Sequence, residues 1–239
     1  MNQSRPVAKP GEPSSFRLIG TLAGVAMLSG ILVAATFQVT RGPIRENQRA
    51  ALEKSVFAVL PEAIHRRNFF LDAGGLQSLP DEALSRANVF AGYDGEGNLT
   101  GVAMEASARG YQDVVRLLYG YDPETGCITG FEILQSSETP GLGDRVETDP
   151  DFQANFECLE ATLNEAGTAL ANPIVTVKNG EKEHPWEIDA ISGATVTCAA
   201  IGTALDRSAS EMAPLLKRYG EGLKEDAEDV VVTAERSLP

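Results

Sequence analysis

The stretch DAISGATVTCAA, residues 189–200, places three hydroxyl side chains around a glycine-alanine pair, just before an apolar run with helical spacing. If a helix begins close to Thr195, its unpaired N–H groups and its dipole favour an anion at that position. Gly193 and Ala194 carry little side-chain bulk, so a planar ligand can approach the backbone. These residues predict a phosphate site, with Thr195 as a residue able to carry the phosphate covalently. The alternative is that Ser192 or Thr195 only caps the helix.

A second stretch, SSETPGLGDR, combines a tight turn with little side-chain bulk. The proline-glycine pair at residues 140–141 is typical of a turn, and Gly143 lets the chain pass close to a ring. Leu142 can cover an apolar ring face, and the polar residues 138–139 can hydrogen-bond the polar edge of the ring. These features favour a ligand pocket, although an ordinary surface turn has the same composition.

Two further residues belong to the predicted site on weaker grounds. Asp189 is too acidic to lie close to a phosphate, so we expect it to orient the loop or to position the metal ion of a modifying enzyme. Tyr111, in the segment RGYQDVV, is a candidate neighbour of the same ligand. A tyrosine buried in the core is the alternative for Tyr111.

Composition excludes several classes of protein. The formal net charge of -14 leaves no broad basic face, so we expect no nucleic-acid partner. The three cysteines, Cys127, Cys158 and Cys198, are widely spaced and lack a CxxC pattern. This spacing argues against a zinc site, a haem or an iron-sulfur cluster. We therefore expect three free thiols and no metal site.

An uncharged apolar run between Arg17 and Arg41 predicts one membrane span over residues 18–40. At about 1.5 Å per residue, a helix of this length crosses a hydrocarbon core of about 30 Å. A cleaved signal peptide is the alternative, because basic residues precede the run. Basic residues also follow the run, so charge alone does not fix the orientation. Since long domains cross the membrane largely regardless of charge, we expect the N-terminus in the cytoplasm and the acidic domain on the outer, periplasmic side.

The chain after the span predicts an α+β domain. Helical spacing after a proline indicates a stalk helix, and a stretch rich in glycine, proline and aspartate indicates a joint. Short β-rich segments then alternate with turn sequences, which predicts four strands in two hairpins and a later fifth strand. The helices are expected at 43–59, 149–163 and 196–219, the joint at 71–85, and the strands at 88–94, 99–106, 114–122, 127–136 and 173–177.

The two motifs resemble those of a known family. DAISGAT resembles the Asp-x-x-Ser/Thr-Gly-Ala-Thr signature of proteins with an FMN-binding domain, and ETPGLG resembles the second signature of that family. The resemblance implies an antiparallel sheet with packed helices, and FMN joined to Thr195 in a phosphoester bond by a flavin transferase. The residues expected to contact FMN are Thr195, Ser192, Gly193, Ala194, Asp189, Glu138, Thr139, Gly141, Leu142, Gly143 and Tyr111.

This resemblance completes the expected organisation of the chain. It comprises a cytoplasmic N-terminus (1–17), a transmembrane helix (18–40), a stalk helix and joint (41–84), an FMN-binding domain (85–219) and an acidic, flexible tail (220–239).

The order of span, stalk and two motifs resembles the G subunits of Rnf electron-transport complexes. The resemblance implies an electron-relay subunit, with no complete active site of its own, in a translocase that couples ferredoxin:NAD electron transfer to ion movement. It also implies other Rnf subunits as partners. The C subunit of the sodium-translocating NADH:quinone reductase shares both motifs and is an alternative. A membrane-anchored FMN-domain protein of another redox system, an interaction module with an empty pocket, and a flavin reductase acting directly on a small substrate are also compatible with the sequence.

Overall fold

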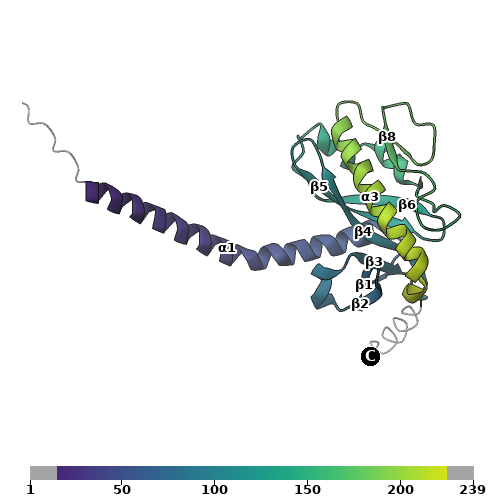
Figure 1. Ribbon diagram of the computed structural model, residues 1–239, viewed down its shortest axis with the longest axis horizontal. Helices are drawn as coiled ribbons and strands as arrows, with labels where there is room; N and C mark the ends of the chain where they lie inside the picture. The colour runs from purple at the N-terminus through teal and green to yellow at the C-terminus, as the bar shows by residue number, and fades with distance from the viewer. Residues whose placement is uncertain (1–14, 225–239) are drawn as a thin grey trace, which may run out of the picture. The chain divides into compact units, whose positions relative to one another are not determined.

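The computed structural model describes residues 15–224 (Figure 1). The chain divides between Gln48 and Arg49 into two compact units. The second unit contains the sheet, the C-terminal helix and the last turns of the N-terminal helix. The first residues of the chain and most of the expected acidic tail, residues 225–239, lie outside the described residues.

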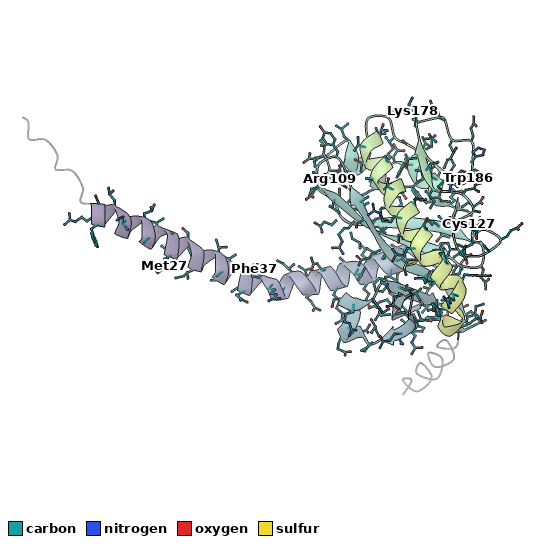
Figure 2. The ribbon with its side chains drawn as sticks, in the orientation of Figure 1. Met27, Phe37, Arg109, Cys127, Lys178 and Trp186 are labelled. Atoms are coloured by element: carbon teal, nitrogen blue, oxygen red, sulfur yellow. A yellow bond between two sulfur atoms is a disulfide. The ribbon has the colours of Figure 1, made fainter. Side chains whose placement is uncertain are left out.

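Helix α1 (Ser15–Val59) is the helix within residues 15–224 that is long and apolar enough to cross a membrane. The expected span and stalk form one continuous helix, with Pro43 in its interior instead of at the start of a second helix. Met27 and Phe37 are 69% and 62% exposed and project from the helix surface (Figure 2). Large apolar side chains that no part of the described chain covers are typical of a helix that faces lipid.

The domain is built on one antiparallel sheet with the strand order β2-β1-β3-β4-β5-β6-β7. The four strands predicted in two hairpins are confirmed as β3 to β6. Both hairpin turns contain a glycine with positive φ, Gly97 in the first and Gly126 in the second. The strands are β1 (His65–Asp72), β2 (Gly75–Leu79), β3 (Val89–Tyr93), β4 (Leu99–Arg109), β5 (Val114–Asp122), β6 (Cys127–Gln135) and β7 (Leu159–Glu160).

Helix α3 (Thr195–Tyr219) crosses one face of this sheet, as predicted from its amphipathic pattern (Figure 1). Apolar residues three and four positions apart in α3 pack against inward-facing strand residues such as Met104 and Leu117. A polar contact accompanies the packing, because the Tyr119 hydroxyl donates to Ser208 Oγ at 2.9 Å. Burial raises the pKa of Tyr119 above its usual range. Tyr119 therefore stays a neutral hydrogen-bond donor in the core.

The opposite face of the sheet receives the C-terminal end of α1. Because side chains alternate along a strand, Phe90 and Leu118 point away from α3 and pack with Val56, Val59 and Leu60 in a second cluster. This smaller cluster joins the end of α1 to the middle of the sheet. The two helices therefore contact opposite faces of the same sheet.

Glycines make room for the end of α1 on this face. A Cβ atom at Gly120 would lie 2.5 Å from the Val59 carbonyl oxygen, and one at Gly92 would lie 2.9 Å from Leu60 Cδ1. Both distances are shorter than van der Waals contact. At Gly120 the neighbour is backbone, so a side chain there would push the end of α1 off the sheet. A Cβ atom at Gly101 would lie 3.0 Å from Leu60 Cδ2, and we call Gly92, Gly101 and Gly120 the glycine seat.

Two segments differ from the sequence-based expectation. The expected joint, residues 71–85, contributes the end of β1, all of β2 and the start of the 3-10 helix η1 (Asp81–Arg86). Ala73 and Gly74 form a tight turn, and Gly75, which has positive φ, begins β2 opposite Asp72. Glycine therefore marks a hairpin here and not a flexible joint. The expected helix at 149–163 is also wrong: α2 (Pro150–Gln153) and η3 (Ala154–Phe156) are short, and the chain then enters β7.

The cysteines also differ from expectation. Cys127 and Cys158 form a disulfide, with Cα atoms 5.0 Å apart, whereas Cys198 is free and buried. The pairing of β6 with β7 places Cys127 opposite Glu160, close to Cys158. The expectation of three free thiols failed because a separation of 31 residues conceals this proximity. Figure 2 labels Cys127 at the start of β6.

Small elements between β6 and α3 complete the domain. Three aromatic rings from β6, α2 and η3, those of Phe131, Phe152 and Phe156, pack edge to face with centroids 4.7 to 6.1 Å apart. This cluster fixes the chain that leaves the second motif. The remaining elements are η2 (Gly143–Glu147), β8 (Val175–Val177) and β9 (Glu187–Asp189), of which β8 lies in the expected strand 173–177 and pairs in parallel with β9.

Candidate functional site

A pocket of about 430 Å³ lies where the second motif meets the start of α3. Its volume falls within the range of about 300 to 1,000 Å³ usual for small-molecule sites. Three segments that are far apart in the sequence line it. The lining residues are Tyr111, Glu138, Thr139, Leu142, Gly143, Gly193, Ala194, Thr195, Val196 and Thr197.

The first turn of α3 points its backbone N–H groups into this region. The N-cap is Ala194, whose side chain cannot accept a hydrogen bond, and Cys198 N–H is the first to bond within the helix, to Ala194. Within residues 15–224, no side chain accepts from the N–H groups of Thr195, Val196 or Thr197. The alternative that Ser192 or Thr195 caps the helix is therefore wrong. The helix start is left as an uncapped donor group, which favours an anion.

A glycine turn leads into α3. Gly193 has φ +89°, in the left-handed region that favours glycine, and Ala194 N–H donates to the Ile191 carbonyl at 3.0 Å. This geometry brings the chain from β9 to the helix start within a few residues. Thr195, the first residue of α3, is exposed at the pocket.

The second motif forms the predicted tight turn. Leu142 N–H donates to the Thr139 carbonyl at 3.1 Å, and Gly141, at the third position of the turn, has φ +77°. Proline at the second position and a positive-φ glycine at the third are the signature of a type II turn. The turn projects Leu142 into solvent beside the pocket, where the side chain is 49% exposed.

Glu138 connects the three pocket segments. It is 8% exposed, and its carboxylate accepts from Thr197 Oγ1 at 2.7 Å and from Gln112 N–H at 3.2 Å. The Gln112 side chain adds a bond to Thr139 Oγ1 at 2.9 Å. The carboxylate thereby joins the turn after β4 and the loop after β6 to the first turn of α3.

Exposed apolar side chains surround the opening of the pocket. Tyr111, Leu142 and Val196 are 69%, 49% and 52% exposed and come from the three different segments. Tyr111 is therefore not the core tyrosine that was the alternative from sequence. Apolar groups left in solvent around a concave site are suited to cover a flat ring.

Asp189, Gly141 and Ser192 were expected at the site but lie outside the pocket lining. The Asp189 carboxylate accepts from Gly180 N–H at 2.7 and 3.0 Å, which closes the loop between β8 and β9. Its backbone N–H donates to the buried Asn155 side chain at 3.0 Å. These contacts place the Asp189 side chain on the loop between β8 and β9.

Sequence reasoning missed Val196 and Thr197. Thr197 is 2% exposed and lies one helical turn before Ile201 and two before Leu205, on the buried face of α3. That spacing was a usable signal, because a hydroxyl in an apolar stripe needs a buried acceptor. Glu138 was expected at the site, but its role as the acceptor for Thr197, 59 residues away, was not evident from the sequence.

Two ionisable groups support the loops behind the pocket. The Asp149 carboxylate caps α2, and the Phe152 N–H group, followed by Arg145, lowers the pKa of that carboxyl. Burial raises the pKa of the Cys198 thiol, which accepts a weak hydrogen bond from Ile191 N–H at 3.4 Å. Cys198 therefore remains a protonated core residue at neutral pH.

Comparison with known proteins agrees with this geometry. Residues 110–210 match the FMN-binding domain family, a range that contains both motifs, and residues 19–59 match the RnfG N-terminal region. The G subunit of the ion-translocating oxidoreductase complex of Methanosarcina acetivorans is 30% identical over 189 residues, covering 79% of this chain and 89% of that protein. The G subunit of the same complex in Cereibacter sphaeroides is 30% identical over 221 residues, with 86% and 91% coverage.

Solved structures show the same fold. NqrC of Shewanella oneidensis superposes with a TM-score of 0.58 at 21% identity, covering 75% of this chain and 99% of that chain. The C subunit of the Na(+)-translocating NADH-quinone reductase of Parabacteroides distasonis gives a TM-score of 0.55 at 18% identity, with 71% and 94% coverage.

Within residues 15–224, the chain combines one candidate membrane span with a domain that matches the FMN-binding domain family. Within that class, the N-terminal match and the identity over most of the chain decide the family. The chain belongs to the family of G subunits of ion-translocating oxidoreductase complexes. The likeness to the NADH-quinone reductase subunits concerns the fold alone.

Proposed function

We propose that this protein carries FMN covalently on Thr195 and relays electrons within an ion-translocating oxidoreductase complex. The observation that carries the proposal is the pocket, in which an exposed threonine hydroxyl stands at an uncapped helix start beside three exposed apolar side chains. The assignment to this complex follows from the names of the relatives, which are subunits of it. The flavin supplies the redox chemistry, and the protein contributes position, hydrogen bonds and charge.

The start of α3 fits a phosphate group. Its free N–H groups and helix dipole favour an anion without a lysine or arginine. Thr195 Oγ is the hydroxyl that the resemblance assigns to the phosphoester, and its exposure leaves it accessible to a modifying enzyme. Gly193 and Ala194 add no large side chain on the approach to it. These features support a flavin transferase as the partner for maturation.

The pocket opening fits the isoalloxazine ring. Tyr111, Leu142 and Val196 offer apolar surface, while Thr139 and the backbone of the 139–142 turn offer polar groups at the edge. A site that combines apolar surface with a few polar groups is typical of cofactor pockets. The large exposed share of these side chains also leaves a bound ring close to solvent or to a neighbouring subunit, as a relay requires.

We also propose that the domain lies on the outer, periplasmic side of the cytoplasmic membrane. The disulfide between Cys127 and Cys158 supports this orientation, because disulfides persist in oxidising compartments and are rare in the cytosol. Electrons then pass between this FMN and other subunits of the complex, coupling ferredoxin:NAD chemistry to ion movement. A covalent tether suits an exported domain, which cannot recapture a lost cofactor from the cytoplasm.

The test is to co-express the full chain with a flavin transferase, purify it in detergent and look for flavin fluorescence in the denatured protein band. Thr195→Val removes the hydroxyl and is expected to abolish the fluorescence. Thr203→Val is the matched control, because Thr203 is an exposed threonine of the same helix whose hydroxyl bonds only to the Ala199 carbonyl. A fluorescent Thr195→Val band, or a colourless wild type with an active transferase, would overturn the proposal. A colourless wild type would favour the interaction module instead.

A further inference from the structure

The buried Glu138–Thr197 pair has no part in the proposed attachment chemistry. Glu138 is one of the few buried charged residues of the described chain, and its two carboxylate oxygens have different partners. Oε2 accepts from the Thr197 hydroxyl and Oε1 accepts from the Gln112 N–H group. Hydrogen bonds to a charged acceptor are about twice as strong as neutral ones, so the pair is a strong link.

The surrounding backbone is shaped around this carboxylate. A Cβ atom at Gly110 would overlap Glu138 Oε1. A Cβ atom at Gly143 would lie 2.9 Å from Glu138 Oε2 and 2.9 Å from Thr197 Oγ1. Glycine at both positions therefore leaves the space that the carboxylate occupies. Gly143 was expected to let the chain pass a ring, and its closest neighbours are these two side chains.

The pair joins the three segments that line the pocket. Tyr111 belongs to the turn after β4, Leu142 to the loop after β6, and Thr195 to the first turn of α3. Hydrogen bonds hold the turn after β4 and the first turn of α3 to the Glu138 carboxylate. The loop after β6 contains Glu138 itself. Thr195 and Thr197 share the first turn of α3, so fixing Thr197 also fixes the direction in which Thr195 presents its hydroxyl.

We propose that Glu138 is a positioning residue that, through Thr197 and Gln112, locks the three pocket segments together and orients Thr195 for modification. The locking is a property of the chain itself, whereas its consequence for Thr195 rests on the proposed function. Gln112 N–H reports the lock directly, since its bond to Glu138 connects the turn after β4 to the loop after β6. Removing the Thr197 hydroxyl leaves one carboxylate oxygen buried without its partner and frees the carboxylate to turn away from Gln112.

Hydrogen exchange of the full chain in detergent, without cofactor, tests the lock. Thr197→Val keeps the shape of the side chain and removes the donor. We expect amide exchange at Gln112 and in residues 139–143 to become about tenfold faster, as for loss of a hydrogen bond to a charged group. Thr197→Ser, which restores a hydroxyl, is expected to return exchange close to the wild-type rate, and Thr203→Val to leave it unchanged.

A double-mutant cycle then separates a coupled lock from two independent contacts. Glu138→Gln offers one acceptor oxygen in place of two and is expected to speed exchange on its own. Adding Thr197→Val to Glu138→Gln should give less than the product of the two separate effects, since both break one network. Multiplicative effects, or no change in Thr197→Val, would overturn the proposal. If Thr197→Val does not fold, Glu138→Gln alone carries the test, and unchanged exchange at Gln112 in that variant would overturn the proposal.

Covalent flavin loading by a flavin transferase is the second readout. We expect the loading rate to fall several-fold in Thr197→Val and to recover in Thr197→Ser, with Thr195 intact in both. Unchanged loading together with faster exchange would overturn the part of the proposal that concerns Thr195. A wild type that takes up no flavin would instead overturn the proposed function, and the exchange experiment would still decide whether Glu138 locks the pocket.

Discussion

The two long helices, α1 and α3, meet the sheet in opposite ways. At the C-terminal end of α1, Val59 and Leu60 are 2% and 4% exposed and lie in the glycine seat. At the N-terminal end of α3, Thr195 is exposed and Val196 is 52% exposed beside a pocket. One helix end is closed by packing, and the other is left open with unpaired N–H groups.

The difference assigns the two helix ends different roles: the end of α1 stabilises the domain, and the start of α3 is available to a ligand. The closed end also carries polar contacts, because the buried Arg66 guanidinium pairs with Glu53 of α1 at 3.4 Å and with Asp81 of η1 at 3.5 Å. The open end carries an exposed apolar opening that gives little stability to the protein alone. An uncapped helix start leaves its N–H groups available to a ligand, and the stabilising contacts of this domain lie elsewhere.

Removing the disulfide is expected to have the largest effect on stability and tests whether the stabilising contacts lie away from the pocket. It lies at the start of β6, whereas the pocket loop follows the end of the same strand. Replacing Cys127 and Cys158 with alanine is expected to lower the free energy of unfolding by about 3 to 4 kcal/mol, from the entropy of a loop of 31 residues. Denaturant unfolding measures the loss. Reductant should lower the denaturation midpoint of the wild type and leave that of the double variant unchanged. Equal midpoints for the wild type and the double variant, with and without reductant, would contradict the prediction.

A smaller effect is expected in the glycine seat. Gly120→Ala would place a Cβ atom 2.5 Å from the Val59 carbonyl oxygen and 2.9 Å from Thr129 Oγ1. In a strand, alanine is normally more favourable than glycine. A loss of about 2 kcal/mol in the free energy of unfolding would therefore result from the close packing of α1 against Gly120. Thermal unfolding measures it, with Gly95→Ala as control because its nearest neighbour, Ile64 Cδ1, lies at an ordinary 3.5 Å. A stabilised Gly120→Ala variant would show that α1 does not sit closely on the sheet.

The smallest effect is expected at the open end. Leu142→Ser changes a side chain that is 49% exposed and is expected to alter the unfolding free energy by less than about 0.5 kcal/mol. The same change at Leu60, which is 4% exposed in the glycine seat, is expected to cost about 3 kcal/mol. Denaturant midpoints compare the two directly. Similar losses for both leucines would mean that the pocket opening is part of the stabilising core.

Local patterns predicted most of the domain. The hairpins of β3 to β6 and helix α3 followed from alternation, turn glycines and helical spacing, each contained in a short window. The joint at 71–85 was misjudged because glycine and proline mark turns between strands as well as flexible links. The helix expected at 149–163 was misjudged because the chain there is fixed by the Phe131, Phe152 and Phe156 cluster and by pairing with β6.

The candidate site was predicted in part for the same reason. Both motifs, with Thr195 and the 139–142 turn, are compact sequence features, and the structure brings them to one pocket. Gly141, Ser192 and Asp189 belong to the same motifs but lie outside its lining, since neighbours in sequence need not face the same side. Thr197 could be found only from its place on the buried face of α3.

The sequence by itself determined the apolar span, the hairpins, the last helix and the two motifs, because each depends on residues a few positions apart. The tertiary structure decided which of these parts meet. The Cys127–Cys158 disulfide joins residues 31 apart, and the bond of Thr197 to Glu138 joins residues 59 apart. Contacts of this kind depend on how the sheet and α3 pack, and no local pattern in the sequence encodes them.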